Sequence, residues 1–301
     1  MLATDIAAPT GRPGETLHLR RVDGGGGGDG RPPVLFLHGS TVPASVAFAS
    51  RFDGLSFLEL AAAQGLDAWS LDFRGFGRSF RPDGSTGPVT STGDAVSDVE
   101  ASVAHILAET GATQLDLVGW SWGATVAGSF AAGRSPRLRR LVLIAPQWLR
   151  DTPSPLLKDP AVLESGYRAV VPEAVAARWI GGLPEQLADQ VTRNGWDRIL
   201  AAALAEEASG AGLAPNGPLR EIHRNWSGGL PVYAPRLIEV PVRVLVGSDD
   251  RETPPPTVRG LFAELVRHPD AQLLEISGAS HFVPLEPKRE QVVHFIAGFL
   301  G

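Results

Sequence analysis

The sequence predicts an α/β protein with a mostly parallel, doubly wound sheet into which a helical segment is inserted. Two observations predict this class. Short apolar runs without polar alternation recur along the chain, as in strands that are buried on both faces of a sheet. Segments with helical periodicity separate these runs, and this order of elements is typical of parallel strands covered by helices.

The first half of the chain follows this alternation. Residues 16–22 alternate between apolar and polar side chains, which predicts an edge strand. The glycine-rich run at 24–30 precedes Arg-Pro-Pro and a further strand, so we interpret it as a loop and not as a phosphate-binding turn. The other expected strands are 34–37, 68–71, 115–118 and 141–145, and the expected helices are 55–64, 91–110 and 124–132.

The character of the chain changes in the middle. Residues 147–240 contain no strand-like apolar run, although the strand pattern returns after them. We therefore predict one sheet domain made of residues 1–146 and 241–301, with residues 147–240 as a helical insertion, hereafter the insertion. The elements expected from here onward are helices at 171–183 and 196–208, strands at 242–246 and 272–276, and a closing helix at 288–300.

The charge balance argues against nucleic acid and anionic membranes as partners. The chain has 27 basic and 33 acidic residues and a net charge of -6, so a basic surface that would attract phosphate groups is not expected. With 43% hydrophobic residues the chain is long and apolar enough to fold around a core. We expect a small-molecule substrate as the partner, and the oligomeric state stays open.

Neither a metal nor another cofactor is expected. The chain has no cysteine, and its seven histidines lack the spacing of metal ligands. No apolar run reaches the roughly 18 residues of a membrane span, and the N-terminus lacks the basic start and apolar run of a signal peptide. We therefore expect a cytoplasmic protein.

The stretch LVGWSWGATVAG places a serine in the middle of a Gly-Trp-Ser-Trp-Gly turn. A short strand precedes Ser121 and a helix rich in small residues follows it. Such a turn strains the backbone of the serine and exposes its hydroxyl, while Gly119 and Gly123 leave room for the neighbouring elements. The amide of Trp122 points into the same space. We expect the Trp120 side chain in the core, and that of Trp122 either in the core or at an acyl pocket.

A serine nucleophile needs a base, and the base needs a carboxylate that orients it. His281 lies in a Gly/Ser loop directly after an expected strand, and Asp249 and Asp250 directly follow another. The carboxyl ends of parallel strands meet at one edge of the sheet, and the chain order is Ser, Asp, His. The sequence therefore predicts a nucleophilic serine site with one of the two aspartates.

Together these motifs resemble the α/β-hydrolase family over nearly the whole chain apart from the insertion. The matching segments are His38-Gly39, Asp72–Ser79, Gly119–Gly123, Gly247–Asp250 and Gly278–His281. The resemblance implies a triad of Ser121, Asp250 and His281, with Asp250 preferred to Asp249 because the family spaces the acid as Gly-x-x-Asp. It also implies that the insertion is a helical cap over the active site. Ser121 argues against the aspartate nucleophile of haloalkane dehalogenases and epoxide hydrolases and against the cysteine of dienelactone hydrolases.

The mechanism that this resemblance implies needs donors for the negative charge that develops on the tetrahedral oxygen. The expected donors are the backbone amides of Trp122 and Ser40, with Thr41 as the alternative to Ser40. We expect His38 to tie its loop to the neighbouring loop and not to transfer protons. The Asp72–Ser79 motif is likewise expected to shape a turn between strand and helix.

The insertion is enriched in aromatic residues that carry a polar group. It contains both tyrosines and four of the seven tryptophans, but none of the 12 phenylalanines. Either these side chains hold the insertion together and against the sheet domain, or two or three of them wall a pocket for a bulky acyl or alcohol group. No basic cluster in the insertion suggests a handle for phosphate or a nucleotide. The candidates for substrate contact are Trp148, Tyr167, Trp179, Trp226 and Tyr233.

Three functional hypotheses follow from these residues. The first is a serine-triad hydrolase that cleaves an ester, thioester or lactone through a covalent acyl-enzyme. The second is a carbon–carbon bond hydrolase, acyltransferase or cyclase of the same fold that acts on a bulky aromatic or polyketide-like substrate. The third is a ligand-binding receptor without enzymatic activity, which the complete set of triad residues disfavours. The fold alone does not choose the bond that is cleaved.

Overall fold

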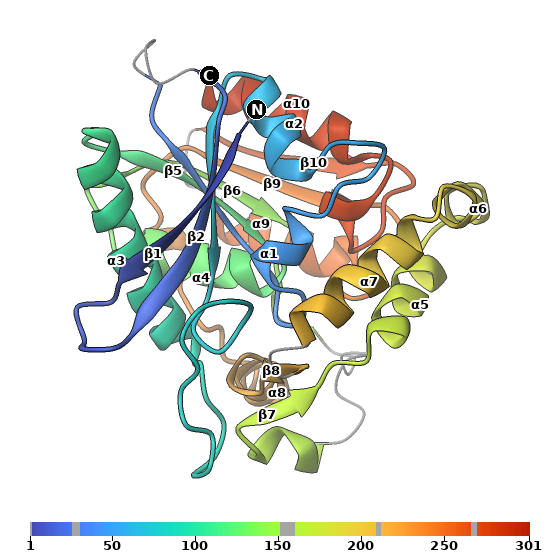
Figure 1. The fold of residues 1–301 in the computed structure, drawn as a ribbon, viewed down its shortest axis with the longest axis horizontal. Coiled ribbons are helices and arrows are strands. Elements are labelled where there is room, and N and C mark those ends of the chain that lie inside the picture. Colours follow the sequence, from blue (N-terminus) through green and yellow to red (C-terminus); the bar gives the residue numbers. More distant parts are fainter. Residues whose placement is uncertain (1, 26–30, 151–159, 209–211, 266–269) are drawn as a thin grey trace.

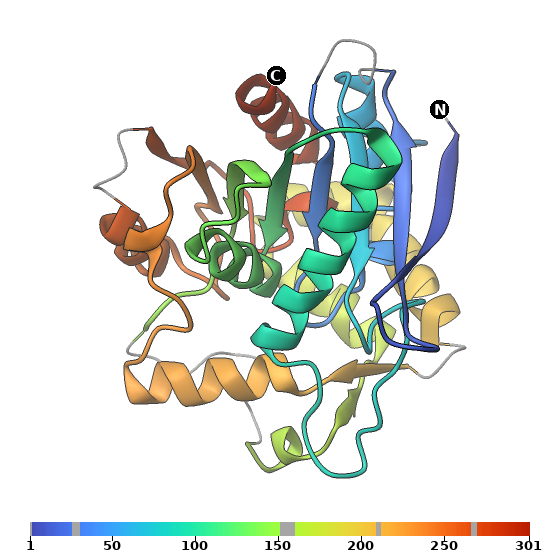
Figure 2. The same cartoon turned by 90° about the vertical axis from the view of Figure 1, so that its left-hand side faces the viewer.

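A computed structural model of the chain describes residues 2–25, 31–150, 160–208, 212–265 and 270–301. An eight-stranded sheet forms its centre and is covered by helices on both faces (Figures 1 and 2). The strands are β1 (Ala3–Pro9), β2 (Thr16–Asp23), β3 (Val34–Leu37), β4 (Asp67–Asp72), β5 (Leu115–Trp120), β6 (Leu138–Ile144), β9 (Val242–Gly247) and β10 (Ala271–Ile276).

The strand order is β1-β2-β4-β3-β5-β6-β9-β10. Strand β2 pairs antiparallel with both β1 and β4, whereas the strands from β4 to β10 are parallel, so the predicted mostly parallel sheet is confirmed. The edge position predicted for residues 16–22 is wrong, because β1 lies outside β2. Strand β1 has only one buried residue, Ala8, and it therefore lacks the apolar run by which a strand is recognised in a sequence.

Helices flank the sheet on both faces. They are α1 (Ala44–Ala47), α2 (Phe57–Ala63), α3 (Thr92–Thr110), α4 (Trp122–Ala132), α9 (Pro255–Leu265) and α10 (Arg289–Leu300). Successive strand residues alternate between the two faces: Phe36 packs in the core under α1, α2 and α10, whereas Leu35 and Leu37 pack in the core under α3 and α4. Because both faces are covered, every residue of β3 is buried, and each large side chain contributes about 1.5–3 kcal/mol by burial.

The chain leaves the sheet after β6 and returns to it at β9. The elements between them are η2 (Pro160–Glu164), β7 (Tyr167–Ala169), α5 (Pro172–Gly182), α6 (Glu185–Arg193), α7 (Trp196–Ala208), β8 (Leu213–Pro215), α8 (Gly217–Gly228) and η3 (Pro235–Leu237). Figure 1 shows α5, α6 and α7 grouped beside the sheet, with β7, β8 and α8 below it.

The insertion is mainly helical, as predicted, but it also contains a two-stranded antiparallel sheet that the sequence did not predict. Strands β7 and β8 have three residues each, which is too short for a recognisable alternation of apolar and polar side chains. The division of the chain into domains stays a prediction.

The described helices also bear on membrane insertion. None of those within the described ranges combines the length and apolar character that crossing a bilayer requires.

Candidate active site

Four loops at the carboxyl edge of the sheet bring the predicted site residues together. Ser40 follows β3, Ser121 follows β5, Asp250 follows β9 and His281 follows β10. Because these strands are parallel, all four loops leave the sheet at the same edge. Residues that are up to 241 positions apart in the sequence therefore meet in one place.

The backbone of Ser121 has φ 57° and ψ -120°, a strained conformation for a residue other than glycine. Helix α4 begins at the next residue, so the serine stands at the corner between β5 and α4. A Cβ atom on Gly119 would lie 2.3 Å from the carbonyl oxygen of Gly123, and one on Gly123 would lie 2.4 Å from that of Leu37. The two glycines are therefore required for the close approach of helix and strands at this turn.

Ser121, His281 and Asp250 form a continuous hydrogen-bonded chain. The Ser121 hydroxyl lies 2.9 Å from His281 Nε2, and His281 Nδ1 lies 2.9 Å from Asp250 Oδ2. A carboxylate accepts only, so Nδ1 carries the proton and Nε2 accepts the hydrogen bond of the serine. All three residues are buried, with 3–5% of their surface exposed.

The structure distinguishes between the two aspartates that are candidates for the acid of the triad. Asp250 Oδ1 accepts hydrogen bonds from the amides of Glu252 and Thr253 at 2.8 and 2.7 Å, and the Thr253 hydroxyl lies 2.8 Å from Oδ2. These donors hold the carboxylate in line with His281. The Asp249 side chain is exposed and accepts a hydrogen bond from Ser248 Oγ at 2.7 Å.

Two opposing effects set the pKa of His281. Burial lowers it, and the negative charges of Asp250 and Glu252 and the hydrogen bond to Asp250 raise it, so that the pKa lies above its usual value. Glu252 Oε2 lies 3.5 Å from His281 Nε2, close to the serine hydroxyl. The sequence did not indicate Glu252 as part of the site.

The loop that carries His281 is fixed from two sides. Trp120 Nε1 donates a hydrogen bond of 2.8 Å to the carbonyl oxygen of His281. The fully buried Glu286 accepts hydrogen bonds from the amide and the hydroxyl of Ser280, and burial raises the pKa of Glu286 to about 7. These hydrogen bonds therefore restrict the loop on which His281 lies.

The loop after β3 carries the amides of Ser40 and Thr41, one of which the sequence predicts as an oxyanion donor. No hydrogen-bond acceptor is found for the backbone amides of Ser40 and Thr41 among the described residues. The carbonyl oxygen of Ser40 accepts a 2.6 Å hydrogen bond from Arg168 Nη2, which also lies 3.1 Å from Thr41 Oγ1. Arg168, in β7, thereby holds the peptide group between Ser40 and Thr41 from the side of the insertion. The choice between these two amides stays open.

His38 and the two tryptophans of the elbow have separate structural positions. His38 is fully buried, its Nδ1 donates to the Gly39 carbonyl at 2.6 Å, and its Nε2 accepts from the Phe73 amide at 3.2 Å. Burial lowers its pKa to about 4, so the ring is neutral and links the two loops. The Trp122 side chain lies in the core and donates to Thr92 Oγ1 at 3.2 Å. The Trp120 side chain packs in the core and also reaches the pocket at Ser121.

A pocket opens above Ser121. Its polar lining includes two charged side chains, Arg178 of α5 and Glu252, whose Nε and Oε1 atoms are 3.0 Å apart. Sequence reasoning missed both, because neither belongs to a motif and only the docking of the insertion brings them together. The residues that line this Ser121 pocket are Gly39, Ser40, Thr41, Val42, Trp120, Ser121, Arg178, Glu252, His281 and Phe282.

The aromatic residues of the insertion lie elsewhere. Trp179 is fully buried against Phe52 and Phe282. The hydroxyl of Tyr167 donates to the Pro82 carbonyl at 2.7 Å, and Trp148 packs edge-on against Tyr233.

None of these four aromatic residues lines the Ser121 pocket. Trp226 lies in α8, and its side chain is outside the described part of the structure. Their role in substrate contact stays a prediction, and the described contacts favour packing.

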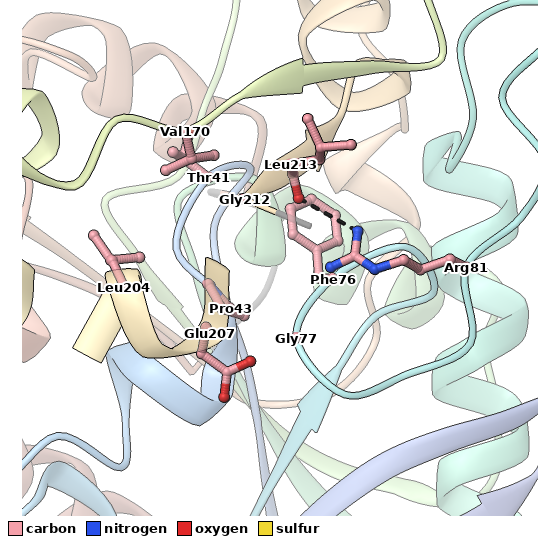
Figure 3. Close-up of a pocket in the computed structure, with 10 residues that line it drawn as sticks. All are labelled: Thr41, Pro43, Phe76, Gly77, Arg81, Val170, Leu204, Glu207, Gly212 and Leu213. Carbon is pink, nitrogen blue, oxygen red and sulfur yellow. Dashed lines mark hydrogen bonds between the residues drawn. The ribbon is translucent and has the colours of Figure 1, made fainter. Parts of the chain in front are cut away.

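A second pocket lies where the insertion meets the rest of the chain and shares Thr41 with the Ser121 pocket. Figure 3 shows Leu204 and Glu207 of α7 on one side of it and Phe76 and Arg81 on the other. Within the described ranges, no three His, Asp or Glu side chains are grouped so that they could hold a metal ion.

Comparison with known proteins gives one family and many similar structures. The model of the "Alpha/beta hydrolase family" matches residues 34–294. Similar solved structures include an esterase from Thermogutta terrifontis (20% identity, 99% of this chain and 98% of the other, TM-score 0.66). A meta-cleavage product hydrolase from Pseudomonas fluorescens IP01 is 18% identical (98% and 96% covered, TM-score 0.67). E-2-(Acetamidomethylene)succinate hydrolase is 22% identical (99% of both chains, TM-score 0.65). At these identities the likeness establishes the fold.

Proposed function

Because this chain belongs to the alpha/beta hydrolase family, we propose that it is a serine hydrolase that cleaves an ester, thioester or lactone through a covalent acyl-enzyme. The observation that carries the proposal is the buried chain of hydrogen bonds from Ser121 through His281 to Asp250. A base that already accepts the hydrogen bond of a serine on a strained strand-to-helix turn is positioned to remove its proton.

In the acylation step, Ser121 Oγ attacks the carbonyl carbon while His281 Nε2 takes the proton of the hydroxyl. Asp250 holds the imidazole tautomer and stabilises the imidazolium that forms. The tetrahedral oxyanion accepts hydrogen bonds from the Trp122 amide and from the amide of Ser40 or Thr41. One such donor contributes about 3–4 kcal/mol to the stabilisation of the transition state.

The tetrahedral intermediate collapses when His281 donates its proton to the leaving oxygen or sulfur atom and the carbonyl carbon releases the leaving group. Water then attacks the acyl-enzyme, and His281 takes a proton from the water molecule. The second tetrahedral intermediate breaks the bond between the acyl carbon and Ser121 Oγ, and the proton returns to the serine. The products are a carboxylic acid and an alcohol or thiol, which for a lactone remain in one molecule.

The lining of the Ser121 pocket supports a small acyl group. Beside the apolar side chains of Val42, Trp120 and Phe282, the lining includes the ion pair of Arg178 with Glu252. A bulky aromatic or polyketide-like substrate, as in the alternative carbon–carbon hydrolase, acyltransferase or cyclase, would find less apolar surface there. We therefore favour ester, thioester or lactone hydrolysis.

A fluorophosphonate probe tests the nucleophile, and a panel of substrates tests the bond. The probe is expected to label the wild-type protein on Ser121 and to leave Ser121→Ala unlabelled. A panel of short-chain esters, thioesters, lactones and one vinylogous diketone then identifies the bond class by product analysis. An unlabelled wild-type protein would contradict the serine mechanism, and turnover of the diketone alone would favour the carbon–carbon alternative.

A further inference from the structure

Two arginines of the insertion approach the Ser121 pocket from different elements. Arg178, in α5, lines the pocket beside Ser121 and His281. Arg168, in β7, contacts the loop of Ser40 and Thr41 that forms another part of the pocket lining. The insertion therefore places two positive charges at a site whose proposed chemistry requires only donors for an oxyanion.

Arg178 is held by an ion pair and a ring contact. Its Nε atom lies 3.0 Å from Glu252 Oε1 but makes no hydrogen bond among the described residues, and its guanidinium carbon lies 5.2 Å from the centroid of the Phe282 ring. Its two terminal nitrogens have no partner in the part of the chain that the structure describes, and 31% of the side chain is exposed. The ion pair with Glu252 and the ring of Phe282 restrict the guanidinium group, and its N–H donors are not used in hydrogen bonds to the described residues.

Arg168 makes four contacts, and all of them are to uncharged acceptors. They are the carbonyl oxygens of Ser40 and Pro215, the Thr41 hydroxyl and the Asn216 side-chain oxygen. Within the described residues no carboxylate lies within ion-pair distance of this guanidinium. Burial and the nearby charge of Arg178 lower the pKa of Arg168 to about 9, so the group is still charged at neutral pH.

The charge of Arg178 lowers the pKa of Arg168, so the two guanidinium groups of the insertion disfavour each other. Like charges repel, and partial burial weakens the screening by water. A bound anion would remove this cost, and positive charge gathered in a cleft is a physical reason to expect one.

We propose that the substrate carries a carboxylate group that binds to the guanidinium group of Arg178 in the Ser121 pocket. The inference rests on the proposed function, since it names the class of substrate for that hydrolase. The planar guanidinium offers two parallel donors that match the two oxygens of a carboxylate. A phosphate dianion would bring a second negative charge next to Glu252, and a carboxylate is therefore the better match.

Sequence patterns did not indicate a binding site for an anion in the insertion, because Arg168 and Arg178 are separated by ten positions and belong to no basic run. Both reach the lining of the Ser121 pocket only because β7 docks on the Ser40 loop and α5 docks over Phe282. Arg168 also supports the oxyanion loop, so Arg178 is the residue that tests the proposal.

Three phenyl esters test whether the carboxylate is recognised on the acyl group or on the leaving group of the substrate. Phenyl butyrate is neutral, monophenyl glutarate carries a carboxylate on the acyl side, and 3-carboxyphenyl butyrate carries one on the leaving group. For the wild-type protein, kcat/KM of one carboxylate ester is expected to exceed that of phenyl butyrate by at least tenfold. In Arg178→Met that ratio falls by at least tenfold, and in Arg178→Lys it falls less because the charge remains.

Arg193→Met is the matched control, since Arg193 is an exposed arginine of α6 in the same insertion and the change removes the same charge. It is expected to keep the wild-type ratio. Calorimetric titration with glutarate and with glutaramide gives a second readout that does not depend on turnover. Glutarate is expected to bind the wild-type protein at least tenfold more tightly than Arg178→Met, and glutaramide is expected to bind neither.

The outcomes separate this proposal from the proposed function. Fluorophosphonate labelling of Ser121 together with equal rates for the three esters and no glutarate binding would overturn the carboxylate proposal and leave the hydrolase proposal standing. Absence of labelling would contradict the hydrolase, and glutarate binding would then decide on its own whether Arg178 holds an anion. A preference that survives in Arg178→Met would also overturn the proposal.

Discussion

The carboxyl edge of the sheet and the insertion contribute to the same pocket in different ways. The sheet edge supplies Ser121, Asp250 and His281 from positions directly after strands, and their hydrogen bonds are complete without the insertion. The insertion supplies Arg168 and Arg178, whose positions depend on how its elements dock. The difference suggests that the sheet determines which bond-breaking chemistry is available, and that the insertion determines which substrate receives it.

Removal of the nucleophile is expected to have the largest effect on activity. Ser121→Ala is expected to lower kcat by roughly 10⁴-fold or more, because the other triad members have no function without the attacking oxygen. The control is Ser97→Ala, which removes an exposed hydroxyl from α3 and is expected to keep wild-type activity. Steady-state kinetics with the best ester and a thermal melt test both variants, and substantial turnover by Ser121→Ala would place the chemistry elsewhere.

The two neighbouring aspartates give the second test. Asp250→Asn is expected to lower kcat by about 10⁴-fold, because an amide at this position favours the wrong tautomer of His281. Asp249→Asn changes the next residue in the same turn and is expected to alter kcat by less than about threefold, since its side chain is exposed. Comparable losses in the two variants would contradict the assignment of Asp250.

The sheet could be predicted from the sequence because its central strands are buried on both faces and therefore appear as continuous apolar runs. Strand β3, with four buried residues, is such a case, and β5 is another. Strand β1 could not be predicted in the same way, because most of its side chains are exposed at the edge of the sheet. The short pairing of β7 with β8 depends on contacts across 44 residues between Ala169 and Leu213 and leaves no local pattern.

The residues of the candidate site likewise differ in whether the local sequence predicts them. Ser121, Asp250 and His281 carry a local signal, since each follows an apolar run in a turn with a characteristic composition. Glu252 and Arg178 carry none, because an ordinary charged residue on a turn or a helix enters a pocket only through tertiary packing. The enrichment of aromatic residues in the insertion was visible in the sequence, but Trp179 shows that such a residue can pack in a core.

A third prediction separates packing from recognition within the insertion. Trp179→Ala is expected to lower the free energy of unfolding by about 3–5 kcal/mol, because a large side chain in full contact with its neighbours is removed. The ratio of kcat/KM between charged and neutral esters is expected to stay within about twofold of wild type, because the residue does not line the Ser121 pocket.

Denaturant unfolding and ester kinetics measure the two effects of this substitution. The control is Val171→Ala, which truncates an exposed side chain just before α5 and is expected to change stability by less than about 0.5 kcal/mol. A large change in ester preference in Trp179→Ala with unchanged stability would show that the residue recognises substrate.

The smallest expected effect concerns the pH dependence of activity, where the two regions act on one group. Catalysis needs neutral His281, so kcat/KM is lost as the pH falls through the pKa of this residue. Glu252 raises that pKa and Arg178 lowers it. Glu252→Gln is therefore expected to move the acidic limb of the pH profile to lower pH, and Arg178→Met is expected to move it to higher pH.

Opposite displacements are a sharper test than either variant alone, because a general loss of structure would move both profiles in the same way. Glu264→Gln, on the exposed side of α9, removes one negative charge far from the ring and is expected to leave the limb in place. The measurement is kcat/KM for phenyl butyrate across the acidic range at constant ionic strength, since this neutral ester does not titrate. If both variants move the acidic limb of the pH profile in the same direction, Glu252 and Arg178 do not act on His281 through their charges. The insertion would then have no electrostatic effect on the pKa of His281.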